Sequence, residues 1–397
     1  MVKSLFFSSK KDSFKTSAQI IADSAEKKYV ENKLNNIDEE ITCDSVSKLN
    51  KEDYSKCSIV FDENGIAKVS ILGRGKFKGL KVIEATKTNA EVIKLEAPKY
   101  GITAVEYIKQ QYEYDGDGLK IDNTPDENIR YYGSDPNNYV RFYNELWRII
   151  GVFGNNVKLI RSEKLGNLSW DSSESSVNGG WGVNEWSQSD LKNYLNTMYY
   201  GGTSVTCYNG KYDQTTTCPT NRLDETSKSL IDNHIWNTGA PNDSTLYDST
   251  TNSYDTVEFY KAERGNETGK ICSSSNYCND TVNRTTTWTG YVGLPYITDY
   301  AYASSESDCN TKIDNSSTYK CKNNNWMFKP NTWYWTLSPD ALSGSSRYVW
   351  YVISDGDVDS NSAATGGAVF PAIYLKSNVL IDSGNGTSSD PYILSGN

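Results

Sequence analysis

The sequence predicts an α+β protein in two parts. The first is a helix followed by a small antiparallel sheet, and the second is a larger α+β domain with two helices, antiparallel strands and long disulfide-stapled loops. Three observations predict it: an apolar stripe of helical spacing in residues 13–33, short alternating runs bounded by Asn, Gly and Pro, and eight cysteines in four close couples.

The helix is expected over residues 13–33, which read SFKTSAQIIADSAEKKYVENK. One face of it collects five residues at spacings of four, three, four and four: Phe14, Ala18, Ile21, Ala25 and Tyr29. That spacing is typical of an amphipathic helix of about five turns. Three strand-like runs follow, SIVFD, AKVSIL and GLKVIEAT, and Asn64-Gly65 between the first two indicates a hairpin.

The cysteine couples are Cys43 with Cys57, Cys207 with Cys218, Cys272 with Cys278, and Cys309 with Cys321. We expect four local disulfides, formed in an oxidising extracellular compartment, with free buried thiols as the alternative. Because C-x2-C spacing is absent and His234 is the single histidine, no zinc site and no cofactor are expected.

The formal net charge of −10 is unevenly spread. Up to Lys99 the chain has 18 basic and 15 acidic residues, leaving 22 of its 40 basic and 35 of its 50 acidic residues for the rest. The acidic larger part argues against nucleic acid as a partner. No run of 18 apolar residues occurs, so we expect contact with a membrane only through an N-terminal segment that is missing here.

We expect a first domain at residues 1–96, a linker at 97–127 and a second domain at 128–397, divided near Pro98 where composition and charge change. In the second domain, strands are expected at 139–143, 146–153 and 157–161. One helix is expected after Ser187, carrying Leu191, Tyr194, Leu195 and Met198, with Asp190 at the capping-box position. Another opens at Asp224 or Thr226, includes His234, and carries Leu230, Ile231 and Ile235. Residues 201–314 are expected to be rich in loops.

The first part resembles a type IV pilin or pseudopilin headpiece, because it combines one helix, a short disulfide and a small antiparallel sheet. The chain begins MVKSLFFSSKKDSF, without the GFTLIE-like apolar segment of that family. The resemblance implies that this part assembles with other pilin subunits. An unrelated α+β module is the alternative.

The last third carries the segments WTGYVGLPYITDYAYAS, NNNWMF, YWTLSPDALSGSSRYVWYVISDGDVDS and AVFPAIYLKSNVLIDSGNGTSSDPYIL. With NELWRIIGVF and VNEWSQSDL upstream, residues 128–397 resemble C-type-lectin-like domains attached to pilin-like proteins of Gram-positive gut bacteria. The implied fold is that of formylglycine-generating enzymes and of the variable proteins of diversity-generating retroelements. The sequence departs from it at Ala368 and Phe370, where Gly and Arg are common.

A candidate ligand-binding surface lies between residues 347 and 361. Val349, Val352 and Val358 are expected to face the core, and aromatic residues among small polar ones are typical of recognition surfaces. The candidate contact residues between these valines are Arg347, Tyr348, Trp350, Tyr351, Ile353, Asp355, Asp357, Asp359 and Asn361. The resemblance implies that sequence variation concentrates here in relatives. The alternative is that Tyr348 and Trp350 fill the core.

Other candidate sites favour simpler interpretations. His234 has no placed nucleophile or acid–base partner, so we expect a core or helix-surface role. Asp115, Asp117 and Asp122 resemble the start of a calcium loop, but Leu119 stands where a ligand oxygen is needed. A solvated turn is therefore expected there, and a hairpin turn at Asp355-Gly356 explains the alternation of Asp355, Asp357 and Asp359.

These features predict an extracellular, pilus-associated adhesin of the cell surface, not an enzyme, whose second domain binds a host or microbial surface protein or glycan. A structural pilin without a specific ligand is the alternative. An enzyme of the formylglycine-generating kind would need unpaired thiols, which the cysteine couples do not leave.

Overall fold

The structure of the chain is a computed structural model. It describes all residues except 1, 48–49, 51, 117, 143, 243–245, 252, 266–284, 315–319, 342–344 and 397, and the side chains of residues 2–7, 314 and 320. The fold is mixed α+β, as the sequence predicts. Two compact units form: Met1–Lys99 with Glu106–Leu119, and Tyr100–Val105 with Lys120–Asn397.

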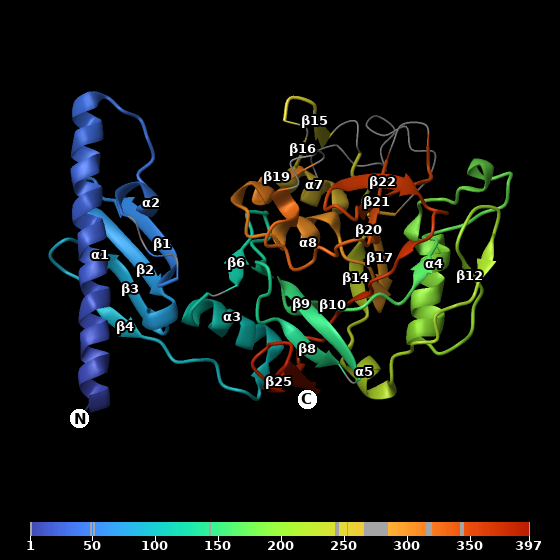
Figure 1. The fold of residues 1–397 in the computed structure, drawn as a ribbon, viewed down its shortest axis with the longest axis horizontal. Coiled ribbons are helices and arrows are strands. Elements are labelled where there is room, and N and C mark those ends of the chain that lie inside the picture. Colours follow the sequence, from blue (N-terminus) through green and yellow to red (C-terminus); the bar gives the residue numbers. More distant parts are fainter. Residues whose placement is uncertain are drawn as a thin grey trace. The chain divides into compact units, whose positions relative to one another are not determined.

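The first unit packs one long helix, α1 (Val2–Asn35), along one face of an antiparallel four-stranded sheet, as Figure 1 shows. The strands follow chain order: β1 (Tyr54–Phe61), β2 (Ala67–Gly73), β3 (Leu80–Ala85) and β4 (Val92–Lys94). Short helical turns are α2 (Cys43–Val46) and η1 (Gly75–Phe77). The three predicted strands and the hairpin before Ala67 are confirmed.

The predicted apolar stripe forms the helix side of this unit's core. Phe14, Ala18, Ile21 and Ala25 are at most 1% exposed, and Tyr29 is half-buried, stacked on Phe61 with 4.7 Å between ring centroids. The helix reaches further in both directions than residues 13–33. Its exposed stretch Ser8–Ser13 has no apolar side chains, which is why the periodicity begins at Phe14.

Residues 97–127 were expected to be a linker, but they carry regular structure. Their elements are β5 (Ile102–Thr103), α3 (Ala104–Tyr114) and β6 (Leu119–Ile121). Within the first unit, Glu113 of α3 pairs with Lys81 of β3 at 3.1 Å, and Asp115 pairs with Lys78 at 2.5 Å. The flanking prolines and glycines suggested a linker, yet Tyr107 and Ile108 of this helix are buried. Burial overrides the local signals there.

The second unit is built on a ten-stranded mixed sheet whose main path runs β18-β24-β10-β9-β8-β26-β25-β5, with β7 beside β9 and β6 beside β7. Its further strands are β7 (Ile129–Tyr131), β8 (Tyr139–Phe142), β9 (Glu145–Phe153), β10 (Asn156–Arg161), β18 (Val292–Gly293), β24 (Ala372–Tyr374), β25 (Leu380–Ser383) and β26 (Tyr392–Ser395). The three strands predicted between residues 139 and 161 are confirmed to within a residue at each end.

A five-stranded sheet, in the order β11-β23-β20-β21-β22, carries the candidate surface. Its strands are β11 (Asn167–Leu168), β20 (Tyr334–Pro339), β21 (Tyr348–Val352), β22 (Val358–Ser362) and β23 (Gly367–Ala368). Smaller sheets are formed by β12 (Cys207–Tyr208), β13 (Thr215–Thr216), β14 (His234–Asn237), β15 (Tyr247–Asp248), β16 (Ser253–Asp255), β17 (Thr287–Gly290) and β19 (Lys312–Asp314).

The first predicted helix of this unit begins later than expected. Ser189, not Ser187, caps α4 (Asp190–Asn193), which continues as a π-helix, η4 (Tyr194–Tyr200). The predicted apolar face is buried, with Leu195 fully enclosed. Single-turn helices η2 (Asn178–Gly180) and η3 (Trp186–Gln188) precede it.

The second predicted helix is shorter than expected and excludes His234. Asp224 caps α5 (Glu225–Leu230) as predicted, but Ile231 is already extended and His234 lies in β14. Trp236 of that strand is fully buried while Ile235 is 61% exposed. Exposed and buried side chains therefore alternate with the period of a strand. The apolar run is too short for its sequence to distinguish a strand from a helix.

Helices α7 (Thr256–Glu263) and α8 (Ile297–Tyr302) were not anticipated, nor were the turns η5 (Ser307–Asn310) and η6 (Lys320–Lys322). All six residues of α8 are buried, so it has no polar face and no amphipathic period to detect. The described residues of the stretch 201–314 consequently hold more regular structure than the composition indicates.

Three of the predicted disulfides are present: Cys43–Cys57, Cys207–Cys218 and Cys309–Cys321. The fourth couple, Cys272 and Cys278, lies outside the described residues. Three local disulfides are consistent with an extracellular protein, since such bonds persist in oxidising compartments.

A buried ion network links the ten-stranded sheet to α8. Asp299 accepts from Arg130 of β7 at 2.6 Å and from Lys158 of β10 at 2.5 Å, and Arg130 also pairs with Asp122 at 2.7 Å. All four side chains are at most 1% exposed. Burial alone would raise the pKa of Asp299, but Lys158 and Arg130 outweigh it and hold the pKa below its usual range.

Candidate functional site

The candidate surface is an antiparallel hairpin at the edge of the five-stranded sheet, coloured orange to red in Figure 1. Strands β21 and β22 pair from Tyr348 with Ser362 to Val352 with Val358. The predicted turn at Asp355-Gly356 is confirmed: the Gly356 N–H donates to the Ile353 carbonyl, and Gly356 has a φ of 102°. Only glycine adopts such a φ without strain.

The predicted core valines are confirmed, because Val349, Val352 and Val358 are fully buried. The assignment of Trp350 to the outer surface is wrong. Its ring is also fully buried, packs edge-on against Phe259 at 5.0 Å, and donates from Nε1 to the Pro241 carbonyl at 3.1 Å. Neighbours on a strand point to opposite faces, so two buried neighbours mean that the sheet is covered on both sides there.

Tyr351 remains a surface residue and belongs to an aromatic cluster with Trp333 and Trp335. Trp333 packs edge-on against Tyr351 at 5.3 Å and against Trp335 at 5.1 Å. Trp335 is fully buried and donates to the Leu168 carbonyl, whereas Trp333 and Tyr351 are half-buried. One enclosed indole thus supports two partly exposed rings.

Polar groups with unused hydrogen-bonding capacity surround these rings. The Tyr351 hydroxyl, the Trp333 indole N–H and the Asn361 side-chain amide nitrogen make no hydrogen bond with a described residue. Burial, helped by the charges of Asp359 and Asp355, raises the pKa of Tyr351 to about 12. Tyr351 is therefore a neutral donor at physiological pH, close to two exposed carboxylates.

One residue of this surface, Trp333, was not predicted. A Cβ on Gly367 would lie 2.4 Å from the Trp333 ring, and one on Gly366 would overlap the Asn209 side chain. Only glycine allows that approach. The Gly366-Gly367 pair is the sequence signal that could have indicated a closely packed partner here.

The outer edge of β22 is capped by its own side chains. The Ser360 N–H donates to Asp359 Oδ1 at 2.7 Å, and the Ser362 N–H donates to Asn361 Oδ1 at 2.8 Å. Covering the donors of an edge strand reduces its pairing with a strand of another chain. Side chains are therefore the groups that this edge offers to a ligand.

The other predicted contact residues separate along the hairpin. Asp355 is exposed at the turn, and Ile353 is half-buried. Asp357 was expected to point outward, but its Oδ1 atom is buried. Arg347 and Tyr348 lie at the opposite end of β21, where an Arg347 Nη2 donates to the Tyr348 hydroxyl at 2.7 Å. The structure thus brings together Tyr351, Asp355, Asp359 and Asn361 but not all nine residues.

Phe370, one of the two positions at which the sequence departs from the pattern that the resemblance implies, fills an apolar site. It is 4% exposed and packs edge-on against Tyr334 at 5.4 Å. The site therefore holds a contact between two aromatic rings and no charged group.

The other candidate sites, His234 and the described aspartates between residues 115 and 122, make structural contacts. His234 stacks on Tyr374 with centroids 3.7 Å apart and bonds Asp232 at 3.0 Å, and burial lowers its pKa. Asp122 is bound to Arg130, and Asp117 lies outside the described residues. No metal-holding group of three His, Cys, Asp or Glu residues occurs in the described part of the chain.

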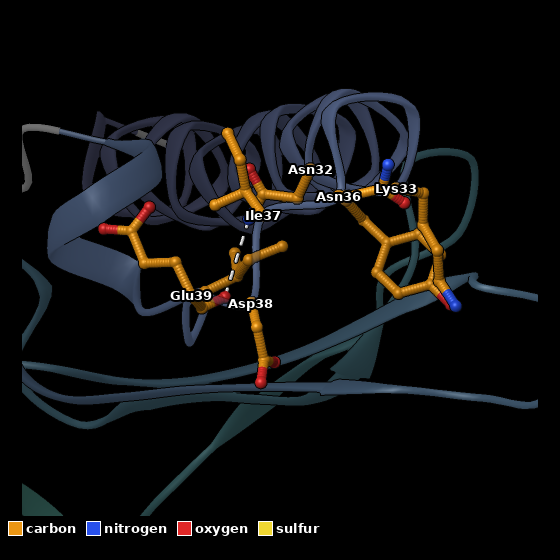
Figure 2. A pocket seen from close by; sticks show the side chains of 8 residues that line it. Asn32, Lys33, Asn36, Ile37, Asp38 and Glu39 are labelled. Atoms are coloured by element: carbon orange, nitrogen blue, oxygen red, sulfur yellow. Dashed lines mark hydrogen bonds between the residues drawn. The ribbon is translucent and has the colours of Figure 1, made fainter.

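The first unit has a pocket of about 390 Å³ at the C-terminal end of α1, shown in Figure 2. Asn36 has a φ of 53°, and the Ile37 N–H donates to the Asn32 carbonyl, so the helix ends in a Schellman motif. Two of the polar lining residues have partners: Asn32 donates to the Glu39 carbonyl, and the Glu39 carboxylate pairs with Lys28. The pocket follows from the chain reversal and carries no evident chemistry.

Comparison with known proteins identifies no relative: no family model, no curated protein and no solved structure matches the chain. Among the described residues, no helix combines the length and apolar character needed to cross a bilayer.

Proposed function

We propose that the chain is an extracellular, pilus-associated adhesin whose second unit binds a surface ligand through the β21–β22 hairpin. The observation that carries this proposal is the half-buried pair Trp333 and Tyr351, mounted on buried Trp335 beside Asp359 and Asn361. Rigid aromatic rings offer contact area at a small entropic cost, and adjacent amide and carboxylate groups supply orientation. The ligand is a protein or glycan with hydrogen-bonding groups.

The first unit supports the pilus part of the proposal. A 34-residue helix packs on a four-stranded antiparallel sheet, and the Cys43–Cys57 disulfide joins the connecting segment to β1. On this account the first unit assembles with other pilin subunits, and the second unit displays the ligand-binding face. A structural pilin without a ligand would have no need of the ring pair.

A binding screen tests the proposal. The purified chain, the Trp333→Ser/Tyr351→Ser variant and the Ile235→Ser variant are applied to an array of glycans and immobilised surface proteins. Ile235 is a matched apolar control, because it is 61% exposed on a different sheet. The proposal expects binding by the parent chain and the control, and its loss in the double variant. Equal binding by all three, or binding by none, contradicts it.

A further inference from the structure

A second cluster of aromatic and cationic side chains lies at the other end of β21. The Lys211 Nζ lies 3.5 Å from the centroid of the Trp181 indole, and the Arg347 Cζ lies 5.8 Å from the same ring. Tyr348 completes the cluster by accepting a hydrogen bond from Arg347. Two cations thus converge on one aromatic side chain.

Neither cation is neutralised within the described part of the chain. Lys211 and Arg347 make no ion pair with a described residue, and the Arg347 Nε is buried without a hydrogen-bond acceptor there. This is unexpected in a chain of net charge −10. Cations without a counter-ion attract an anion, and a bound carboxylate would offset the charge of either group.

Two nearby carboxylates accept hydrogen bonds from backbone N–H groups. Asp171 accepts from the backbone N–H groups of Val183 and Asp190, and Asp190 accepts from that of Ser172. Burial raises the pKa of Asp171 to about 7, which reduces its negative charge at neutral pH. Further acidic neighbours in sequence are Asp213, two residues after Lys211, and Glu185, which accepts from the backbone N–H groups of Ser187 and Gln188.

The loop that carries Trp181 is fixed to the start of β21. Asn178 donates to the Gly182 carbonyl at 2.7 Å and to the Ser346 hydroxyl at 3.1 Å. Gly179, Gly180 and Gly182 all have positive φ, and a Cβ on Gly182 would lie 2.4 Å from the Asp171 carbonyl oxygen. The indole and Arg347 are therefore held in place before any ligand arrives, which lowers the cost of binding.

We propose that Lys211 and Arg347, which both lie against Trp181, bind the carboxylate of an acidic sugar, a uronic or sialic acid within a surface glycan. This inference rests on the proposed function and narrows its ligand from protein or glycan to an anionic glycan. A guanidinium and an ammonium pair with a carboxylate, and the aromatic neighbours provide apolar area for a sugar ring. Arg347 precedes Tyr351 by four strand positions, about 13 Å. An oligosaccharide therefore suits both clusters better than a single sugar.

The probes are a panel of oligosaccharides containing uronic or sialic acid, each beside its methyl ester, which removes the charge and keeps the sugar. Binding is measured by calorimetry with the parent chain, Lys211→Met, Arg347→Gln, and Trp333→Ser/Tyr351→Ser. Methionine keeps the apolar stem against Trp181, and a thermal melt verifies folding. An acid form should bind at least about tenfold more tightly than its ester, and each charge variant should remove most of that difference.

The outcomes separate this inference from the proposed function. If acid and ester bind equally, or the charge variants keep the preference for the acid, the anionic site is wrong, while loss of binding in the double aromatic variant would still support the hairpin site. If no panel member binds but neutral glycans or acidic peptides do, the assignment to an acidic sugar fails. If a glycan binds with the double aromatic variant unimpaired, the proposed hairpin site fails instead.

Discussion

The phenolic hydroxyl of Tyr300 in α8 donates a 2.8 Å hydrogen bond to the carbonyl of Gly356 at the turn of the β21–β22 hairpin. Tyr300 is fully buried, and the next residue back along the helix is Asp299 of the buried ion network. The turn of the candidate site is therefore held by a helix that is itself fixed to the ten-stranded sheet by ion pairs.

Replacing Tyr300 with Phe should loosen that turn. The Gly356 carbonyl loses its buried donor, which should cost about 1–2 kcal/mol of unfolding free energy. Urea denaturation measures the loss, with Tyr212→Phe as control, because Tyr212 is 57% exposed and its hydroxyl bonds no described residue. Equal stability of the two variants would show that the bond does not support the hairpin.

Truncation of Trp350 should be far more damaging than loss of the outer rings. Trp350→Ala leaves a cavity against Phe259 and removes the bond to Pro241, so a cost of about 3–5 kcal/mol is expected. Trp333→Ser/Tyr351→Ser changes half-buried rings and should cost less. Thermal melts compare the two, and a double variant that melts as low as Trp350→Ala would place its rings in the core.

The stability of the second unit should fall as pH rises from about 4.5 to about 7, because of Glu263. Burial raises the pKa of Glu263 to about 7 from the ordinary 4.5, despite Arg264 and hydrogen bonds from Thr298 and Ser338. The folded state then binds more protons than the unfolded state between these values. Raising the pH from 4.5 to 7 should therefore lower the free energy of unfolding by about 3 kcal/mol through this group.

The Glu263→Gln variant isolates that contribution. Lys158, whose pKa burial lowers to about 8, acts above this window, and Asp299, whose pKa is depressed, acts below it. Asp171, whose pKa burial also raises to about 7, acts inside the window in parent and variant alike, so the difference between the two reports Glu263. Denaturation at closely spaced pH values should therefore show a shallower dependence between pH 4.5 and 7 in the variant than in the parent. Curves of the same slope would mean that Glu263 is ionised throughout.

Local sequence signals predicted the elements that depend on neighbours in the chain. The stripe from Phe14 to Ala25 and the strands around Gly154 needed only spacing and turn residues. The ion network could not be predicted, because Arg130 and Asp299 are separated by 169 residues. Trp350 was misplaced for a related reason: the alternating pattern assumes one covered face, and α7 with its neighbours covers the second.

The cysteine prediction was the most secure part, since short loops leave few alternative partners. Replacing Cys207 and Cys218 with Ser should cost about 2–3 kcal/mol, because the 11-residue separation limits the unfolded chain only moderately. Denaturation of the oxidised parent and variant measures this.

Non-reducing peptide mapping should also show Cys272 linked to Cys278, and a linkage of either to another couple would contradict the local pairing.

The most direct test of the central claim is fluorine NMR of the chain labelled with 5-fluorotryptophan, titrated with the best-binding member of the glycan and protein array. The chain has ten tryptophans, and the Trp333→Phe variant assigns the resonance of interest. A ligand seated on the hairpin should shift the Trp333 resonance in proportion to occupancy and leave that of buried Trp147 unchanged. A bound ligand that leaves Trp333 unshifted would contradict the account.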